Sequence, residues 1–377
     1  MFNMISRDKA YRIRPHYSVV PHSPDTVELR AGVWNPVSIT LNDSTASGKL
    51  HRTLELLDGT RELAAVEREA GISREELESL LSHLEHYNAI STGPDNFLDY
   101  QVELLGGTLA NIGEPHRQMP KIEILSDSAL GNDLATHISD CGDSPHVIGV
   151  ADSLFASLMR DDFTLSEDPL RALENEKQYE QWRNRFLVVA LETVNPILFR
   201  NLNRVSLRYS FPWIHAALDG PFVLVGPTFI PGCSSCYECF EGRVASNIRE
   251  SGSYLSYKKA LATGKVKMGR NVVPKAIRSL LVSLTALEVL NFVSTGSAFT
   301  IGKTLAIYLP TLEFTFNQVL RLPGCAGCSS MNEKNEQTLY FNVKSFVNSL
   351  YSDKDGHRDI PACDAVPEVT GQARARK

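Results

Sequence analysis

The sequence lacks the marks of a membrane, secreted or nucleic-acid-binding protein. No stretch reaches the ~18 consecutive apolar residues that a membrane span needs, and the first nine residues, MFNMISRDK, contain no apolar core of a secretory signal. The net charge of −6 provides no excess of positive charge for nucleic acid or an anionic membrane surface. We therefore expect a cytoplasmic protein that binds neither.

Cysteine is also scarce, with seven residues among 377. In a reducing compartment so few thiols predict no disulfide framework, and closely spaced pairs are better interpreted as metal or redox chemistry. Hydrophobic residues make up 43% of the chain and charged residues 22%, as in ordinary globular proteins. A chain of this length is expected to form two or three domains.

The first ninety residues have the pattern of strands followed by helices. Period-two alternation predicts three strands, at 17–22, 26–30 and 37–41, with turn residues between them. Apolar residues at helical spacing then predict three short helices, the second opening at Thr60 and the third at Ser73 in a capping-box pattern. Together these elements predict a winged helix-turn-helix domain over residues 1–92.

The rest of the chain has the pattern of an α/β domain. Residues 93–120, which contain Gly-Pro and Gly-Gly, are expected to be a linker. Alternating strands and helices predict a doubly wound sheet over 121–350, with a buried helix at 277–293 and a polar tail at 351–377. Short apolar runs predict the strands at 122–125, 146–150, 186–191, 222–225, 305–309 and 313–322.

Two nearly identical segments, PGCSSC at 231–236 and PGCAGC at 323–328, each carry a Cys-x-x-Cys pair. A two-residue gap lets one tight turn present two thiolates, and four thiolates at tetrahedral angles form a structural zinc site with no position left for water. We therefore predict a zinc ion that joins the two segments. The predicted ligands are Cys233, Cys236, Cys325 and Cys328. Cys239 also follows Cys236 by a two-residue gap and is the alternative to one of them, although no Pro-Gly pair precedes it.

A glycine-rich phosphate loop is another missing feature. Strand, small-residue loop, helix, strand and acid is the order of a nucleotide site in a doubly wound sheet. The loop here is SDSALG at 126–131, which keeps only Gly131 of the G-x-G-x-x-G pattern, and Asp127 within it would repel phosphate. Asp152 stands where a ribose-binding acid belongs. The interpretation is a degenerate nucleotide site, retaining Gly131 and Asp152, in a topology kept as scaffold.

Several segments together resemble the ubiquitin-activating, or ThiF-like, superfamily. They are the degenerate loop, the run ETVNP at 192–196, the run DGPFVLVGPTFIPGCSSCYECFEGR at 219–243 and LPGCAGC at 322–328. Over nearly its whole length the chain is similar to the C protein of azole- and azoline-forming cyclodehydratases, which act in the biosynthesis of thiazole/oxazole-modified microcins and related bacteriocins. That branch also has an N-terminal winged-helix module that binds a leader peptide.

The resemblance implies a subunit that cyclodehydration requires but that performs no chemistry itself. Adenylating members of the superfamily hold magnesium with an acid at the position of Val194, and an isopropyl group cannot ligate a metal. ATP is therefore not expected to be used by this chain. The implied partners are a precursor leader peptide and a YcaO-type cyclodehydratase subunit, and the oligomeric state is open, a homo-oligomer included.

The predicted third helix has a surface unsuited to DNA. It carries four glutamates and one arginine over residues 73–85, which would repel phosphates. The same shape suits β-augmentation, in which an extended peptide pairs with the free edge of strand 37–41 and places alternate side chains beside the helix. The predicted peptide contacts are Val37, Ile39, Leu41, Leu77, Leu80, Leu81 and Leu84. Some of these leucines must instead serve the core of the domain.

Two rival functions differ in class from a peptide-binding scaffold. The first is an ATP-dependent enzyme that adenylates a precursor peptide, as other peptide-modifying members of the superfamily do; AMP release from labelled ATP would identify it. The second is a transcriptional regulator, which a gel-shift assay would reveal.

Overall fold

The structure is a computed structural model of the 377-residue chain, described here for residues 9–34, 37–92, 120–139, 144–160, 163, 174, 176–267, 269 and 274–329. The chain divides into two compact units, residues 1–95 and 96–377, and each is described by itself. The expected linker, except residue 120, and the expected C-terminal tail lie outside the described residues.

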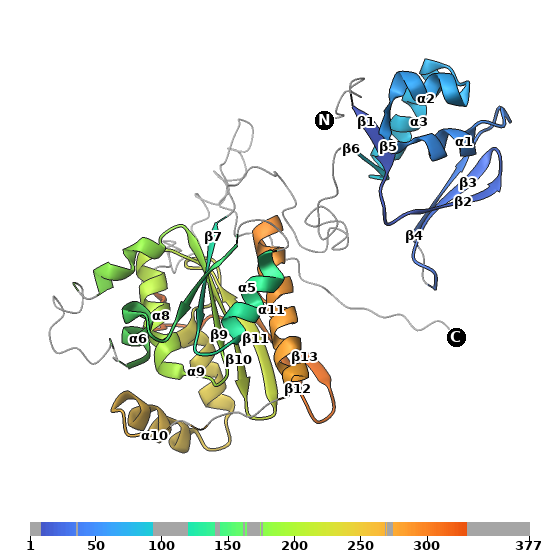
Figure 1. Ribbon diagram of the computed structural model, residues 1–377. Helices are drawn as coiled ribbons and strands as arrows, with labels where there is room; N and C mark the ends of the chain where they lie inside the picture. Colours follow the sequence, from blue (N-terminus) through green and yellow to red (C-terminus); the bar gives the residue numbers. More distant parts are fainter. Residues whose placement is uncertain are drawn as a thin grey trace, which may run out of the picture. The chain divides into compact units, whose positions relative to one another are not determined.

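In its described residues the first unit contains two three-stranded antiparallel sheets and three helices (Figure 1). One sheet has the order β2-β3-β4, formed by β2 (Ser18–Ser23), β3 (Thr26–Ala31) and β4 (Val37–Asn42), within one residue of the predicted strands. The other has the order β5-β1-β6, formed by β1 (Ala10–Ile13), β5 (Asp58–Glu62) and β6 (Ile90–Thr92), none of which was predicted. Thr60, the predicted start of a helix, is therefore a strand residue.

The helices of this unit are α1 (Leu50–Leu56), α2 (Leu63–Ala70) and α3 (Arg74–His86). The capping box at the start of α3 is present: the Ser73 hydroxyl accepts the Glu76 N–H at 3.3 Å, and the Glu76 carboxylate accepts the Ser73 N–H at 2.8 Å. One face of α3 packs on Val27 and Leu29 of β3 in a single core. The position of α3 against the sheet is thus set by both its cap and its apolar face.

The second unit is built on a seven-stranded mixed sheet of order β13-β12-β11-β10-β9-β7-β8. Strands β8, β7, β9 and β10 are parallel, whereas β11, β12 and β13 run antiparallel to their neighbours, so the sheet is only in part the expected doubly wound arrangement. The strands are β7 (Lys121–Ser126), β8 (His146–Gly149), β9 (Arg185–Leu191), β10 (Trp213–Asp219), β11 (Phe222–Phe229), β12 (Lys303–Tyr308) and β13 (Glu313–Gln318).

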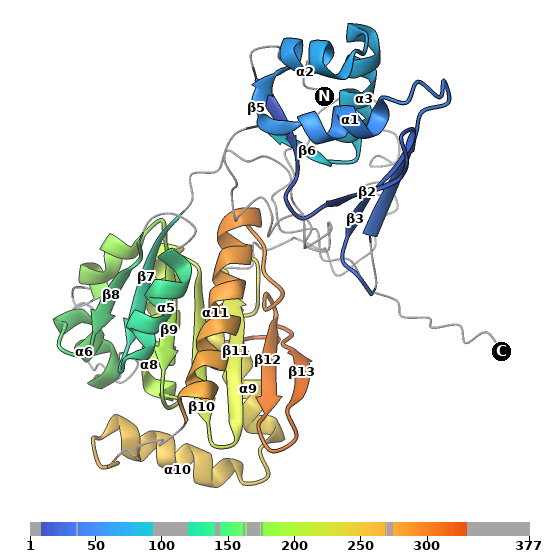
Figure 2. The same ribbon diagram turned by 45° about the vertical axis from the view of Figure 1, so that its right-hand side comes forward.

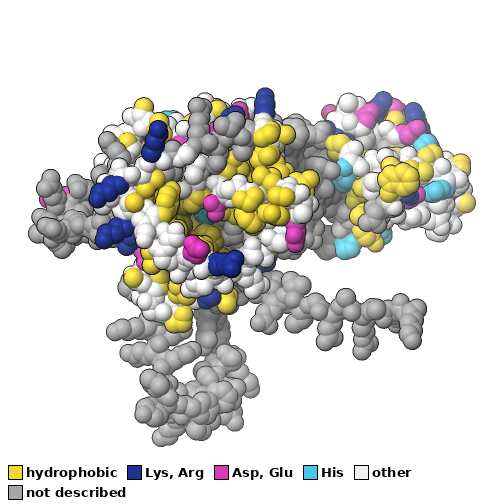
Figure 3. All heavy atoms as spheres, turned by 90° about the horizontal axis from the view of Figure 1, so that it is seen from below, with side chains coloured by type: hydrophobic (Ala, Val, Ile, Leu, Met, Phe, Trp, Pro, Cys, Tyr) yellow, Lys and Arg dark blue, Asp and Glu magenta, His cyan; other side chains and the backbone are white. Residues whose placement is uncertain are grey.

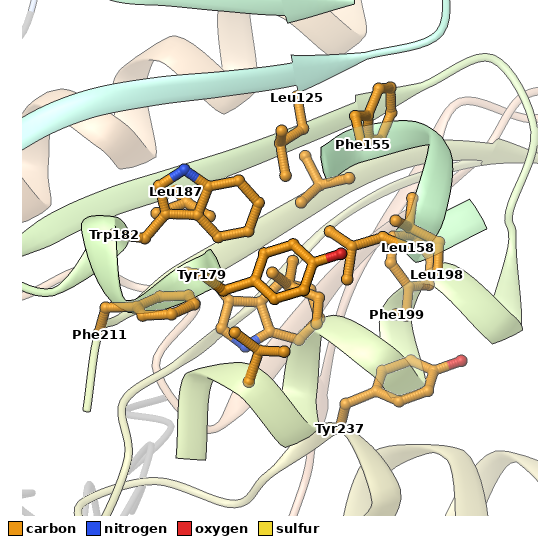
Figure 4. Packing of buried hydrophobic residues seen from close by; sticks show 14 of the residues in the cluster. Leu125, Phe155, Leu158, Tyr179, Trp182, Leu187, Leu198, Phe199, Phe211 and Tyr237 are labelled. Carbon is orange, nitrogen blue, oxygen red and sulfur yellow. The ribbon is translucent and has the colours of Figure 1, made fainter. Parts of the chain in front are cut away.

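Helices cover both faces of this sheet (Figure 2). On one face lie α5 (Leu130–Ser139) and α11 (Lys275–Thr295). The other face packs on α6 (Ser153–Arg160), the short 3-10 helix η1 (Gln178–Trp182), α8 (Pro196–Tyr209) and α9 (Tyr237–Asn247), followed along the chain by α10 (Ser251–Ala262). Figure 4 shows the aromatic centre of this second layer, where Tyr179 and Trp182 lie beside Phe211.

Helix α11 is long and apolar enough to cross a membrane by length and composition alone. In the structure it packs on the sheet, and its Val282 and Val289 belong to the same buried cluster as Leu305 and Ile307 of β12. The sequence predicted a buried helix, but not all of its apolar side chains are covered: Leu287 is 44% exposed. Sequence composition therefore overstated how deeply this helix is buried.

Candidate functional site

Four buried cysteines meet where two distant segments of the second unit come together. Cys236 is the residue before α9, Cys239 lies in the first turn of α9, and Cys325 and Cys328 follow β13. All four sulfur atoms lie within 4.8 Å of one another. The two segments that sequence analysis paired are thus brought together by the fold.

The spacing of these sulfurs matches a tetrahedral thiolate site. In a tetrahedron with metal–sulfur bonds of about 2.3 Å, the sulfurs lie about 3.8 Å apart. The Sγ–Sγ distances are 3.6 Å for Cys236–Cys325, 3.6 Å for Cys239–Cys328 and 3.8 Å for Cys236–Cys239. The four cysteines can therefore hold one metal ion, and four protein ligands would leave no open position for a reactant.

One member of the predicted ligand set is replaced in this cluster. Cys233 is exposed, is part of a disulfide bond and does not belong to the group, whereas Cys239 takes its place. The reason is local geometry: Cys233 lies in the turn before the helix, while the first turn of α9 directs Cys239 to the same side as Cys236. The second Cys-x-x-Cys gap in CSSCYEC was the sequence signal for this choice.

Arginines hold the two segments together around the cysteines. The Arg321 guanidinium donates to the carbonyl of Ser234 at 3.1 Å and to that of Gly232, while Arg243 of α9 donates to the carbonyls of Leu320 and Arg321. Burial raises the pKa of the Cys328 thiol to about 11 and also raises the pKa of the Cys236 thiol. A bound cation would supply the charge that stabilises these sulfurs as thiolates.

A groove of about 1030 Å³ lies in the first unit between β4 and α3. All six residues of β4 line one side, and the opposite side is formed by α3 and the residues flanking it. The α3-side lining residues are Ile72, Glu75, Glu76, Ser79, Leu80, His83 and Tyr87. Glu76, Leu80, His83 and Tyr87 follow helical spacing, which is the sequence signal that could have identified this face.

The predicted peptide contacts divide between this groove and the core. Val37, Ile39 and Leu41 line the groove, as does Leu80. The predicted contacts Leu77, Leu81 and Leu84 are at most 1% exposed and belong to the core with Val27 and Leu29, so these three do not line the groove. They occupy the opposite face of α3, because residues four and seven positions apart share one side of a helix.

β4 is the outer strand of its sheet and pairs only with β3 among the described residues. The N–H of Asp43, which follows β4, donates to the Asp25 carbonyl at 2.8 Å. Backbone groups alternate sides along an antiparallel strand, so the odd-numbered residues of β4 bond to β3. The N–H and C=O groups of Ser38, Thr40 and Asn42 therefore point to the open edge.

The groove has more acidic than basic groups. Its lining contains Asp43, Glu75 and Glu76, against one lysine, Lys49. Hydrogen bonds from Ser47 and Thr45 hold the pKa of the Asp43 carboxyl far below its usual range, so this carboxylate is charged at neutral pH. The charge of the groove favours basic groups on a ligand.

Two residues of the predicted phosphate loop, Asp127 and Gly131, take part in packing and hydrogen bonding within the protein. Gly131 lies in α5, where an added Cβ would be 2.7 Å from the Ser126 Cβ and 2.9 Å from a Val147 methyl, so this glycine allows the helix to pack closely on the sheet. Asp127 accepts the Glu192 N–H at 3.1 Å. Burial raises the pKa of the Asp127 carboxyl, and the neighbouring Glu192 carboxylate adds to this effect.

The remaining nucleotide residues have local structural roles. Asp152 follows β8 as expected, and its carboxylate accepts the N–H groups of Leu154 and Phe155, at 2.8 and 3.3 Å, at the start of α6. Val194 packs against the hydrophobic cluster beneath α8. Neither role was predicted. The Asp127–Glu192 bond joins residues 65 positions apart, at the ends of separate strands, whereas the capping by Asp152 is local and its sequence signal was an Asp directly before an apolar helical pattern.

No protein-family model and no curated protein matches the chain. Similar solved structures include a heterocyclase in complex with substrate and cofactor, with a TM-score of 0.59, 15% identity, and coverage of 85% of this chain and 39% of that one. The heterocyclase TruD has a TM-score of 0.57 and 19% identity, with 85% and 43% coverage. This chain shares the fold of these heterocyclases.

The comparison confirms, at the level of the fold, the resemblance inferred from the sequence. The chain spans less than half the length of the two heterocyclases. E. coli MccB with ATP also matches, at a TM-score of 0.47 and 14% identity over 84% of this chain and 99% of that one.

Proposed function

We propose that this chain captures the leader of a precursor peptide and presents its core Cys, Ser or Thr residues to a YcaO-type, ATP-dependent cyclodehydratase that forms azoles or azolines. The observation that carries the proposal is the open backbone edge of β4 beside the groove-lining face of α3. An extended peptide added to this edge would gain backbone hydrogen bonds, while the groove selects its side chains.

The winged-helix interpretation of the first unit supports the same function. Val37, Ile39 and Leu41 line the groove from the strand, and Leu80 lines it from the helix, so apolar peptide side chains would contact both walls. Capture by this unit raises the effective concentration of the core peptide at the active site of a partner. A binding subunit can thereby be required for turnover in the cytoplasm without supplying a catalytic group.

We assign zinc, in a structural role, to Cys236, Cys239, Cys325 and Cys328. The ion would join the start of α9 to the segment after β13, and no position would be left for substrate. These residues are not among those that line the β4 groove. Zinc would therefore affect stability more than peptide affinity.

The chemistry is proposed to lie on another polypeptide. In the loop at 126–131 a helix-packing glycine and a bonded carboxylate occupy the place of a phosphate cradle, which argues against the rival activity of peptide adenylation. More than half of the length of the two similar heterocyclases has no counterpart in this chain. Incubation with labelled ATP, magnesium and peptide should release no AMP.

A proline substitution in β4 tests the mode of binding. Fluorescein-labelled leader peptides from short open reading frames beside the gene are titrated with the full chain, and binding is followed by anisotropy. Thr40→Pro removes one N–H from the open edge but leaves the β3–β4 hydrogen bonds intact. Loss of about 1 kcal/mol for this hydrogen bond, with some distortion of the edge, should weaken binding about tenfold.

Thr40→Ala is the matched control, because it removes the same side chain but keeps the amide. It should bind with nearly wild-type affinity. Equal affinities of the proline and alanine variants, or no binding of any neighbouring leader by the wild-type chain, would contradict peptide capture at this edge.

A further inference from the structure

The outermost strand of the seven-stranded sheet carries an exposed apolar row. Every residue of β13 is exposed, and β13 pairs only with β12 among the described residues. Phe314 and Phe316 alternate with the polar residues Glu313, Thr315 and Asn317, and the last residue of the strand, Gln318, lies on the same face as the phenylalanines. Together with the flanking Leu312 and Leu320, the two phenylalanines are 53–62% exposed, so apolar side chains at alternate positions remain in contact with water.

This apolar row continues the sheet face that α11 covers. Phe314 lies opposite Ile307 and Phe316 opposite Leu305, and both β12 residues belong to the cluster that packs on α11. Figure 3 shows hydrophobic side chains gathered on the β12–β13 side of the second unit. The row therefore extends the hydrophobic layer past the last residues that the helix covers.

The outer edge of β13, on the side away from β12, also has open backbone groups. The Val319 N–H donates to the Gly302 carbonyl at 2.8 Å, in the same register as the β12–β13 pairs. By alternation, the N–H and C=O groups of Phe314 and Phe316 point away from β12. The strand contains no lysine, proline or bulge, which are the usual means of protecting an edge from pairing.

We propose that β13 pairs antiparallel with β13 of a second copy of this chain, across a twofold axis at Thr315. Such an edge is complementary to itself, because the same donors and acceptors face each other in reverse order. Phe314 then lies opposite Phe316 of the other copy, and Glu313 opposite Asn317, so no like charges meet. The four phenylalanines form one apolar layer between the two α11 helices.

The size of the apolar row is consistent with one half of such an interface. Four side chains of roughly 200 Å² each, a little more than half exposed, present about 450 Å² per copy, against about 800 Å² per partner in a standard interface. The paired backbone edges and Leu287 of α11, which is 44% exposed, would contribute further area. This proposal is independent of the peptide groove.

Sedimentation equilibrium of the full chain tests the pairing. The wild-type chain should have twice the monomer mass of 41.8 kDa at micromolar concentration. Phe316→Asp should raise the dimer dissociation constant at least tenfold, because a charge replaces an apolar contact at the axis. Leu255→Asp is the control: Leu255 of α10 is 58% exposed but lies outside β13, and its substitution should leave the dimer unchanged.

A pair of charge substitutions tests the register, even if Phe316→Asp does not fold. Asn317→Lys places an ammonium opposite Glu313 of the other copy and should tighten the dimer several-fold, whereas Asn317→Asp places like charges together and should weaken it. The proposal would be overturned by a wild-type chain that is still monomeric at 50 µM or by a Phe316→Asp variant that dimerises normally. Equal effects of lysine and aspartate at position 317 would also overturn it.

Discussion

The sulfur atoms of Cys236 and Cys325 lie 3.6 Å apart, although 89 residues separate them in the chain. Between them run α9, α10, α11 and the β12–β13 hairpin. Their contact requires the chain to return from the edge of the sheet to the start of α9. A metal ion bound here would therefore close a long loop, and closure of a long loop stabilises a fold mainly by restricting the unfolded chain.

The geometry of the cysteine cluster indicates that the Cys239 thiol is required for zinc binding. Cys239→Ser should reduce bound zinc from about one ion per chain to a small fraction, because a hydroxyl is a poor substitute for the fourth thiolate. Loss of roughly 3 kcal/mol of metal-derived stability would lower the unfolding temperature of the second unit by about 6–12 °C. Elemental analysis and calorimetry measure the two effects.

Cys233→Ser is the matched control for this experiment. Cys233 is exposed and lies outside the cluster, so its substitution should leave the zinc content unchanged. The same substitution opens the disulfide bond of Cys233, so it is the control for zinc content and not for the unfolding temperature. If Cys233→Ser loses zinc while Cys239→Ser retains it, the ligand set expected from the Pro-Gly pattern is the correct one.

Substitution by alanine is expected to have different effects on stability at two glycines, Gly131 and Gly149. Gly131→Ala should destabilise the second unit by about 1–2 kcal/mol, because overpacking against Ser126 and Val147 exceeds the gain in helix propensity. At Gly149, an added Cβ meets no atom within 4 Å, and alanine should be neutral or slightly stabilising. Thermal unfolding of both variants would show whether Gly131 is retained for packing; equal stabilities would contradict that role.

The difference in stability between the wild-type chain and Asp127→Asn is expected to depend on pH. Because burial raises the pKa of Asp127 in the folded chain, folding favours the protonated carboxyl, and this contribution is lost as pH rises from about 4 through the folded pKa. Asp127→Asn keeps an oxygen to accept the Glu192 N–H but cannot ionise. Its unfolding temperature relative to wild type should increase between about pH 4 and 7; a constant or falling difference would contradict the buried-carboxyl interpretation.

Patterns that repeat within a few residues allowed much of the fold to be predicted. The alternation in 17–41 located β2, β3 and β4, and Ser73 with Glu76 located the start of α3. Strands β1, β5 and β6 were missed, because each is short and obtains its hydrogen bonds from partners far along the chain. The antiparallel half of the large sheet was likewise undetermined, since strand direction depends on tertiary pairing.

The sequence by itself determined that two Cys-x-x-Cys segments occur, that the phosphate loop lacks its glycines and that a capped helix follows three strands. Each of these properties depends on residue type and short spacing. Only the tertiary structure decided that Cys239 joins the cluster in place of Cys233, that Leu80 faces the groove while Leu81 is buried, and that β4 and β13 have open edges. These outcomes depend on the direction in which a side chain or backbone group points, and that direction is set by packing between elements distant in the chain.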